Sequence, residues 1–340
     1  MSNWYLQSGK DSDVVISSRV RFARNLLEYN FPGRFVKDES KKVFEKLEEI
    51  TPSLGYGLKF LKLDNIDDIT KISLMEKHLI SPDFAMNSRP NKAIIINDDE
   101  NICIMINEED HLRIQVFTAG FELENLVGLI SEIDDKLSEL VDYAYSEKFG
   151  YLTACPTNVG TAMRISIMCH LPALTITGNI GKVLRAVNNF GMNIRGIYGE
   201  GSESKGDVYQ IFNNQSLGLS EKEIMKNVRA ITEKIIEQER LARKNLTKKP
   251  IDLEDRVYRA YGLLTNSRKL SSDECKQLLS DVKLGTDLGI IDEINDAKVK
   301  KLEIYTQPGN LQKYAGTQLN SFDRDIKRCE IIKQIVNENS

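Results

Sequence analysis

Hydrophobic and polar residues partly alternate along several short segments in the first two thirds of the chain. This period of two is typical of strands with one buried face, so we expect strands at residues 93–97, 102–106, 113–117 and 207–212. A very polar stretch, Asn107 to His111, lies between the second and third of these segments. Because it joins two expected strands, it predicts a cluster of polar groups at a sheet edge.

Helical patterns become frequent towards the end of the chain. Ser220-x-x-Glu223 and Ser271-x-x-Glu274 have the spacing of capping boxes and precede apolar residues at helical intervals. The first predicts one long helix over residues 221–245. A basic, proline-containing stretch at 244–250 follows, and only short helices are expected beyond it. These features predict a catalytic domain at residues 1–246 and a smaller helical domain at residues 247–340.

The segment from Cys155 to Thr161 precedes an apolar run at 162–168, which has a spacing that we interpret as a helix. A cysteine at the start of a helix is stabilised as a thiolate by the helix dipole, although free cysteines are more often small buried hydrophobes. No lysine follows Gly160, so the segment is not a P-loop. The interpretation places His170 at a helix end, in a structural role.

Composition narrows the range of functions. The 340 residues are 41% hydrophobic, which suffices for sizeable cores. Their net charge of −4 argues against a general nucleic-acid or membrane binder, because no overall positive charge attracts polyanions. The five cysteines show no C-x-x-C spacing, and the three histidines form no metal-binding pair. These patterns predict no protein-derived metal ligands. Because no apolar segment has membrane-spanning length, we expect a cytoplasmic protein.

Arginines and acids supply the candidate chemistry. Five arginines, at positions 19, 21, 113, 164 and 195, would together form a clamp for a triphosphate, because guanidinium groups stay charged and grip phosphate oxygens with paired donors. Surface salt bridges are the alternative for each arginine taken alone. Glu108, Glu109 and Asp110 form an acidic run that could equally be a solvated turn, and Glu200 adds a further carboxylate.

Four segments resemble, in order and spacing, the signatures of the phosphagen (guanidino) kinase family. They are Ser18-Arg19-Val20-Arg21, Asn107 to Arg113, Cys155 to Thr161, and Arg195-Gly196-x-x-Gly199-Glu200. The resemblance implies an α+β fold, with a large, mostly antiparallel sheet flanked by helices and a smaller all-helical C-terminal domain. Ala162, after Gly160-Thr161, departs from the family pattern.

The resemblance also implies roles for individual residues. Glu109 and Glu200 correspond to the carboxylates that grip and deprotonate a guanidinium, with Cys155 beside them. The implied ATP-binding residues are Ser17, Ser18, Arg19, Val20, Arg21, His78, Arg113, Arg164, Ile165, Ser166, Ile167, Met168, Arg195, Gly196, Ile197, Tyr198, Gly199 and Glu200. Mg²⁺ would be held mainly by the ATP phosphates and water.

Within the family, the chain resembles the branch that phosphorylates arginine residues in proteins. The motifs begin near residue 14, so we expect the helical N-terminal domain that closes over small substrates in metabolite kinases to be missing. Arg324, Asp325 and Arg328 match a motif of this branch that binds phosphoarginine allosterically, although Cys329 replaces its alanine. An exposed charged helix is the alternative interpretation.

The implied function is transfer of the γ-phosphoryl group of ATP to protein arginines, which marks proteins for Clp-type degradation and inactivates a heat-shock repressor. The implied partners are protein substrates, a zinc-binding activator, the repressor and a Clp ATPase or protease. A homodimer is one oligomeric state compatible with the sequence. Two other functions are weighed: a kinase of free arginine or another guanidino metabolite, and a catalytically silent adaptor that binds phosphoarginine.

Overall fold

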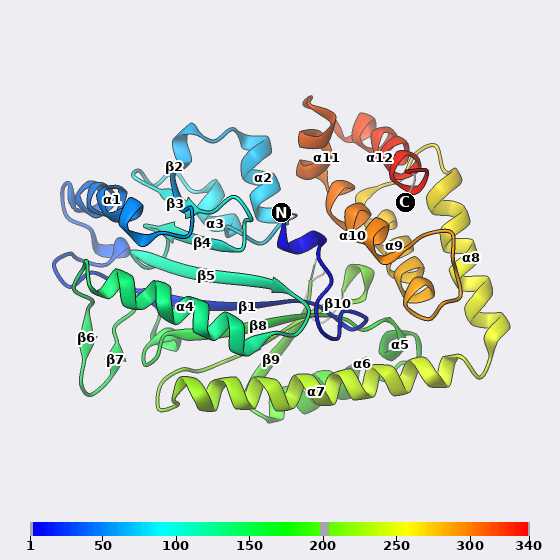
Figure 1. Cartoon of the computed structure of the whole chain (residues 1–340), viewed down its shortest axis with the longest axis horizontal. Helices are drawn as coiled ribbons and strands as arrows, with labels where there is room; N and C mark the ends of the chain where they lie inside the picture. Colours follow the sequence, from blue (N-terminus) through cyan, green and yellow to red (C-terminus); the bar gives the residue numbers. More distant parts are fainter. Residues whose placement is uncertain (1–2, 198–203, 339–340) are drawn as a thin grey trace.

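The computed structural model describes residues 3–197 and 204–338, and an eight-stranded antiparallel sheet forms its centre (Figure 1). The strands follow the order β2-β3-β4-β5-β1-β8-β10-β9 across the sheet. Their bounds are β1 Val15–Arg24, β2 Lys59–Lys62, β3 Ala93–Ile96, β4 Ile102–Ile106, β5 Leu112–Ala119, β8 Met163–His170, β9 Met192–Gly196 and β10 Val208–Asn213. Two further short strands, β6 Tyr145–Ser146 and β7 Gly150–Tyr151, pair with each other.

The four strands expected from alternation are confirmed as β3, β4, β5 and β10. One expectation is wrong: the apolar run after Gly160 forms strand β8 and not a helix. Its alternate residues Met163, Ile165 and Ile167 reach the core, as the period of a strand requires. Cys155 therefore lies before the short 3₁₀ helix η5 Pro156–Asn158 and not before an α-helix. His170 is the last residue of a strand.

One face of the sheet packs on the main hydrophobic core. Helices α4 Leu123–Ser138 and α7 Glu221–Leu246 run along this face, joined by α1 Glu39–Ile50, α5 Pro172–Ile176 and α6 Ile180–Asn189 (Figure 1). The predicted long helix is confirmed as α7, where Ser220 and Glu223 exchange both hydrogen bonds of a capping box.

A second, smaller core lies on the other side of strands β3 and β4. There α2 Asp68–Glu76, α3 Pro82–Met86 and the 3₁₀ helix η1 Trp4–Leu6 cover one part of the sheet face. The remaining 3₁₀ helices are η2 Pro32–Arg34, η3 Thr51–Leu54, η4 Leu63–Asn65 and η6 Lys205–Asp207. The part of this face next to β1, β8 and β9 carries polar side chains.

Five helices after Leu246 pack around a core of their own, as expected for the end of the chain. They are α8 Pro250–Asn266, α9 Ser272–Asp287, α10 Asp296–Tyr305, α11 Pro308–Ala315 and α12 Ser321–Val336. We call this unit the helical domain. Ser271 caps α9 by accepting a hydrogen bond from the Glu274 N–H. No helix within residues 3–197 and 204–338 has the length and apolar character needed to cross a membrane.

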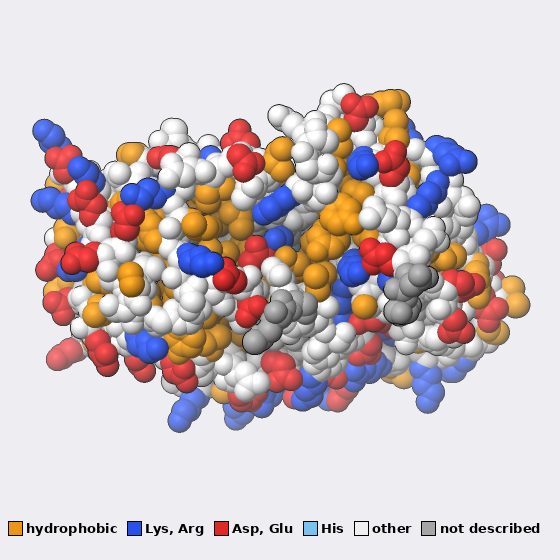
Figure 2. Space-filling view, turned by 45° about the horizontal axis from the view of Figure 1, so that its top comes forward, with side chains coloured by type: hydrophobic (Ala, Val, Ile, Leu, Met, Phe, Trp, Pro, Cys, Tyr) orange, Lys and Arg blue, Asp and Glu red, His pale blue; other side chains and the backbone are white. Residues whose placement is uncertain are grey.

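Acidic and basic side chains are interspersed over the surface that Figure 2 shows. This mixture fits the small net charge of −4. Any strong attraction for an anion must therefore come from a local cluster of cations.

Candidate active site

The polar part of the sheet face is built by simple alternation along the central strands. In β1, Val20 and Phe22 belong to the apolar core, so Arg19 and Arg21 project from the opposite face. In β8, Ile165 and Ile167 take the core positions and Arg164 projects with the other arginines. The sequence thus places cations on one face because it places aliphatic residues on the other.

The strand register brings like charges directly opposite each other. Arg21 of β1 is the cross-strand partner of Arg164 in β8, and Arg19 stands opposite Ser166. Such a pairing is unfavourable for the sheet. Burial, followed by the neighbouring Arg113, Arg195 and Arg164, lowers the pKa of Arg19 to about 9, and burial and the same kind of repulsion hold the pKa of Arg21 well below its ordinary value. The positive charges of this arginine cluster therefore repel one another, and a bound anion would stabilise them.

Three of the five arginines have partners in the protein. Arg113 forms an ion pair with Glu108 at 2.7 Å, and Arg195 donates two hydrogen bonds to the Gln210 side-chain oxygen, at 2.9 and 3.2 Å. Arg164 donates to Asn158 at 3.3 Å. Within the described residues the Nε of Arg21 is buried and has no acceptor. A phosphate oxygen would supply one.

Two adjoining cavities open on this face. The larger cavity, of 660 Å³, has room for a nucleotide. It is lined by Arg19, Arg113 and Arg195 together with His78. The other, of 140 Å³, is lined by Glu109, Arg164 and Asn158 among others. Arg21 and Arg113 line both cavities. A phosphoryl group held between them could pass from one cavity to the other.

The acidic run forms the turn between β4 and β5, and its three carboxylates have different surroundings. Glu108 is buried and accepts hydrogen bonds from Ser81 at 2.6 Å and from Arg113. Its pKa is lowered despite its burial, because Arg113 lies beside it. Glu109 is exposed, lines the smaller cavity, and its carboxylate makes no hydrogen bond or ion pair within the described residues. Glu109 is therefore free to bind a guanidinium.

Asp110 ties this turn to the loop that carries Cys155. Its Oδ1 accepts hydrogen bonds from the Asn25 side-chain amide at 2.6 Å and from the Ala154 N–H at 2.7 Å. Burial raises the pKa of this carboxyl group to about 6, and the neighbouring Glu109 and Glu108 add to the effect. Cys155 is partly exposed, and its Sγ lies 3.1 Å from the Thr157 hydroxyl.

Ala162, the departure from the family pattern, has a left-handed backbone with φ of 52°. It is buried and lines the smaller cavity between the Cys155 loop and β8. An L-residue pays a steric penalty in this conformation, which explains why glycine suits the position.

The remaining predicted ATP-binding residues lie in several environments. Val20, Ile165 and Ile167 belong to the apolar core, and Ser18 donates a hydrogen bond to the Gly120 carbonyl, so their side chains do not line either cavity. Burial and the nearby arginines lower the pKa of His78 to about 3, so its imidazole is neutral. Gly196 and Ile197 line the larger cavity. Ser166 is buried opposite Arg19, while Ser17 and Met168 line a separate cavity towards the helical domain. Tyr198, Gly199 and Glu200 lie outside the described residues.

Two residues of the site were missed by sequence reasoning. Gln210 accepts both hydrogen bonds of Arg195, and Asn158 accepts one from Arg164. Gln210 could have been found from the alternation in β10, where Tyr209 and Ile211 are core residues. Asn158 lies within the segment Cys155 to Thr161, but its contact with Arg164 could not be predicted because it depends on how the loop folds.

The C-terminal motif is largely built into the helical domain. Arg328 is 1% exposed and donates to the carbonyls of Leu270 and Thr306, at 2.6 and 2.8 Å, and to Asp325 at 2.8 Å. Arg324 is partly exposed and donates to the Leu319 carbonyl at 3.0 Å. Arg328 thus holds helix α12 to the residue that precedes α9, and Arg324 and Asp325 are its more accessible neighbours.

Fold and site together define a phosphotransferase of the guanidino kinase class. Residues 36–242 match the family described as "ATP:guanido phosphotransferase, C-terminal catalytic domain", and residues 250–340 match "Protein-arginine kinase McsB C-terminal domain". Among solved structures, taurocyamine kinase from Schistosoma mansoni aligns with a TM-score of 0.60 at 24% identity, over 68% of this chain and 34% of that one. Lombricine kinase aligns with a TM-score of 0.59 at 22% identity, over 71% of each chain. These two share the fold.

Relatives similar over nearly their whole length narrow the assignment. A protein-arginine kinase from Halothermothrix orenii is 46% identical over 99% of this chain and 97% of its own length. One from Halalkalibacterium halodurans is 47% identical over 98% of this chain and 94% of its own. The chain therefore belongs to the protein-arginine kinases of the ATP:guanido phosphotransferase family, and it is an ATP-dependent phosphotransferase.

Proposed function

We propose that this protein transfers the γ-phosphoryl group of ATP to arginine side chains of other proteins. The observation that carries the proposal is the meeting of two cavities at Arg21 and Arg113, one lined by arginines and the other by the free carboxylate of Glu109. The relatives named protein-arginine kinase support arginine in proteins as the acceptor.

The arginine cluster fits the triphosphate because its charge is not balanced by protein carboxylates. Arg21 offers a buried donor without a partner, and Arg19 also makes no hydrogen bond or ion pair within the described residues. In the proposed complex, Arg19 and Arg195 bind phosphates in the larger cavity while Arg21, Arg113 and Arg164 surround the γ-phosphoryl group. Mg²⁺, carried by the phosphates and water, would offset further negative charge.

The acceptor guanidinium would enter the smaller cavity and pair with Glu109. An arginine side chain is a poor nucleophile because its pKa exceeds about 12 and its lone pairs are delocalised. As the new N–P bond forms and the bond from γ-phosphorus to the bridging oxygen breaks, Glu109 takes a proton from the attacking nitrogen and ADP leaves. We assign Glu200 as the second carboxylate and Cys155 as a neighbour of the acceptor, following the family resemblance.

The test is to incubate the protein with ATP, Mg²⁺ and either an unfolded protein or free arginine, and to analyse the products by mass spectrometry under conditions that preserve acid-labile phosphate. Phosphoarginine in the protein substrate is the expected result. Phosphorylation of free arginine alone would identify a metabolite kinase. Binding of phosphoarginine without any phosphoryl transfer would identify a silent adaptor.

We extend the proposal to regulation and to cellular role on the strength of the family resemblance. Arg324 and Asp325 would bind phosphoarginine allosterically in the helical domain, residues 247–340. Because Arg328 is buried and holds carbonyl groups, Arg324→Gln is a better test than Arg328→Ala, which would disturb packing. Weaker binding of free phosphoarginine by Arg324→Gln is expected, and unchanged affinity would refute the site.

The proposed role also includes a cytoplasmic location, activation by a zinc-binding protein, inactivation of a heat-shock repressor and marking of proteins for a Clp protease. The sharpest assay is degradation of one substrate by Clp components before and after treatment with this protein and ATP. Degradation that requires the treatment would support the marking role, and equal degradation would exclude it.

A further inference from the structure

Helix α9 of the helical domain forms hydrogen bonds with the residue that precedes strand β10 of the central sheet. Asp207, directly before β10, is 4% exposed and has φ of 55°. Its Oδ2 accepts hydrogen bonds from the Ser280 hydroxyl at 2.7 Å and from the Gln277 amide at 3.4 Å. Both donors belong to α9. A residue in a strained conformation is thus held from another domain.

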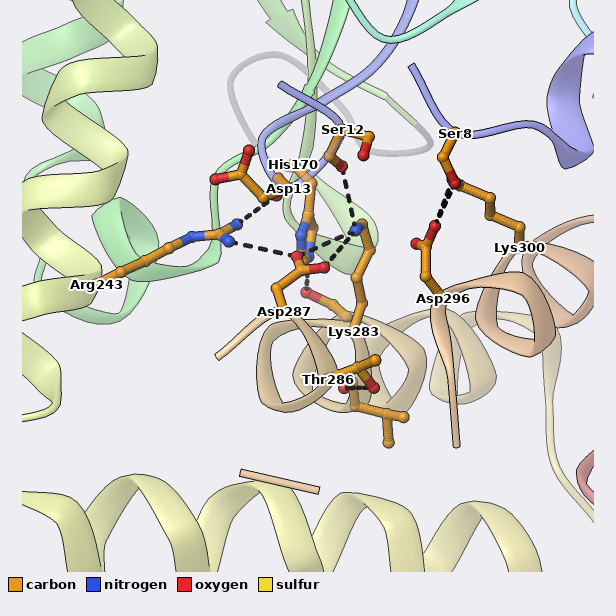
Figure 3. A network of polar contacts seen from close by, with 12 residues as sticks. Ser8, Ser12, Asp13, His170, Arg243, Lys283, Thr286, Asp287, Asp296 and Lys300 are labelled. Carbon is orange, nitrogen blue, oxygen red and sulfur yellow. Dashed lines mark hydrogen bonds and ion pairs between the residues drawn. The ribbon is translucent and has the colours of Figure 1, made fainter. Parts of the chain in front are cut away.

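Ser280 connects a third element through the same hydroxyl group. Its single hydrogen is donated to Asp207, so it can only accept from the Nε2 of His170, which lies 2.9 Å away. His170 therefore carries a proton on Nε2, and burial together with Lys283 and Arg243 holds its pKa well below the ordinary value, so the imidazole is neutral. Figure 3 shows His170 beside Arg243, Asp287 and Lys283 where the domains meet. One hydroxyl group joins the end of β8, the start of β10 and helix α9.

Two more contacts fix the same junction. Lys205 forms an ion pair with Asp273 in the first turn of α9. Gly206 lies so close to α9 that a Cβ atom there would stand 3.0 Å from the Lys276 carbonyl oxygen. The backbone of residues 205–207 consequently packs closely against α9.

The strand that begins at this junction presents a residue of the nucleotide cavity. Gln210, three residues after Asp207, lies opposite Arg195 of β9 and accepts its two hydrogen bonds. Both residues line the 660 Å³ cavity. Three residues of strand span about 10 Å, so the junction is close to the cavity and connected to it by one stiff element.

The segment just before α9 is attached to the C-terminal motif. The Leu270 N–H donates to the Asp325 carbonyl at 3.1 Å, and Arg328 donates to the Leu270 carbonyl at 2.6 Å. Leu270 immediately precedes the cap residue Ser271. Helix α9 therefore contacts the motif at its start and the strand of the nucleotide cavity at Ser280.

We propose that Ser280 and Asp207 are positioning residues for ATP: through them, α9 sets the placement of the Arg195–Gln210 pair, so the helical domain determines nucleotide affinity. The inference rests on the proposed function in assuming that ATP occupies the cavity lined by Arg195. Neither Ser280 nor Asp207 needs to touch the nucleotide.

The first experiment measures the Kd of Mg²⁺-ATP by calorimetry for the full-length protein, without any acceptor. Ser280→Ala removes the hydroxyl group that joins β8, β10 and α9, and about tenfold weaker ATP binding is expected. Thr286→Val is the matched control, because it removes a hydroxyl group from the same helix whose acceptors, the Val282 and Ile294 carbonyls, both lie in the helical domain. Parental affinity in a folded Ser280→Ala protein would overturn the proposal.

A second pair of variants tests the junction by its shape. Gly206→Ala and Gly289→Ala place a methyl group on similar left-handed backbones, with φ of 74° and 65°, but only the Gly206 position meets α9 and the other faces open space. Weaker ATP binding in Gly206→Ala alone is expected, and equal affinities in the two variants would contradict the proposal. This pair decides the matter if Ser280→Ala does not fold.

The parent protein separates this inference from the proposed function. Parental ATP binding without arginine phosphorylation of proteins would count against the function only. Parental phosphorylation with unchanged ATP binding in Ser280→Ala and Gly206→Ala would count against the junction only.

Discussion

Asp110→Asn should make the protein more stable at neutral pH, and the gain should shrink as the pH falls. Asp110 is 2% exposed, and burial together with Glu109 and Glu108 raises the pKa of its carboxyl group from 3.8 to about 6. A raised carboxyl pKa means that ionisation costs more in the folded state than in the unfolded chain. The cost is absent below the unfolded pKa, grows as the pH rises, and is complete above the folded pKa.

The size of the effect follows from the shift. A shift of roughly two units corresponds to about 3 kcal/mol when the group is fully ionised in both states. At about pH 4.5 the folded carboxyl group is mostly protonated, and only about 1 kcal/mol of the cost is present. Between about pH 4.5 and 7.5, the stability of Asp110→Asn relative to the parent should therefore rise by roughly 2 kcal/mol.

Urea unfolding of both proteins at the two pH values measures this difference, because the titration of all other groups cancels when the variant is compared with the parent. Asparagine keeps an oxygen that can accept from Asn25 and Ala154, so the turn should hold its shape. Asp98→Asn provides the same chemical change at a side chain that is 80% exposed. A difference that is independent of pH, or that equals the Asp98→Asn baseline, would refute the assignment of the cost to burial of Asp110.

Three further substitutions probe the site and the helical domain. Glu109→Gln should lower the single-turnover rate of arginine phosphorylation by about 10²–10⁴-fold with ATP affinity unchanged, because the carboxylate serves only the acceptor; a weakened ATP affinity would contradict this. Arg21→Gln should weaken ATP binding at least about tenfold in calorimetry while leaving the melting temperature equal or higher, since it removes one of two opposed, half-buried charges, and a lower melting temperature would count against charge repulsion. Gly285→Ala should destabilise the protein by about 1–3 kcal/mol in urea unfolding because its Cβ would collide with buried Val257, whereas Gly262→Ala, with open space in α8, should stabilise it by about 1 kcal/mol; similar effects of the two would refute the packing argument.

The sequence predicted β3, β4, β5 and β10, although every residue of β3 and β4 is buried and these two strands have no polar face. The interpretation failed at residues 162–168, where a helix was expected although Met163 to Ile167 alternate between apolar and polar residues. In the structure, Met163, Ile165 and Ile167 face the main core, while Met168 faces the cavity between the domains. Consecutive apolar residues at the two ends of the run, Ala162-Met163 and Ile167-Met168, interrupt the period of two and made the pattern compatible with a helix.

The charged residues of the site could be proposed from the sequence, but the sequence did not predict which of them are buried with partners in the protein and which are accessible to a ligand. Glu108 and Glu109 are adjacent, yet Glu108 is buried against Ser81 and Arg113 whereas Glu109 is exposed. Likewise, Arg324 and Arg328 share a helical spacing, but Arg328 is enclosed by carbonyl groups from α10 and the segment before α9. These differences depend on long-range contacts that no local pattern encodes.

The arginine cluster destabilises the sheet because its like charges repel one another. Arg21 and Arg164 oppose each other across the sheet, and a protein selected for stability alone would place a carboxylate between them. Two carboxylates of the neighbouring turn have other partners: Glu108 forms an ion pair with Arg113, and Asp110 accepts hydrogen bonds from Asn25 and Ala154. Neutralising Arg21 internally would remove the driving force for binding phosphate, so the sheet must tolerate the repulsion. In the proposed complex the phosphates of ATP would relieve that repulsion, which would place the negative charge of the nucleotide beside Glu109.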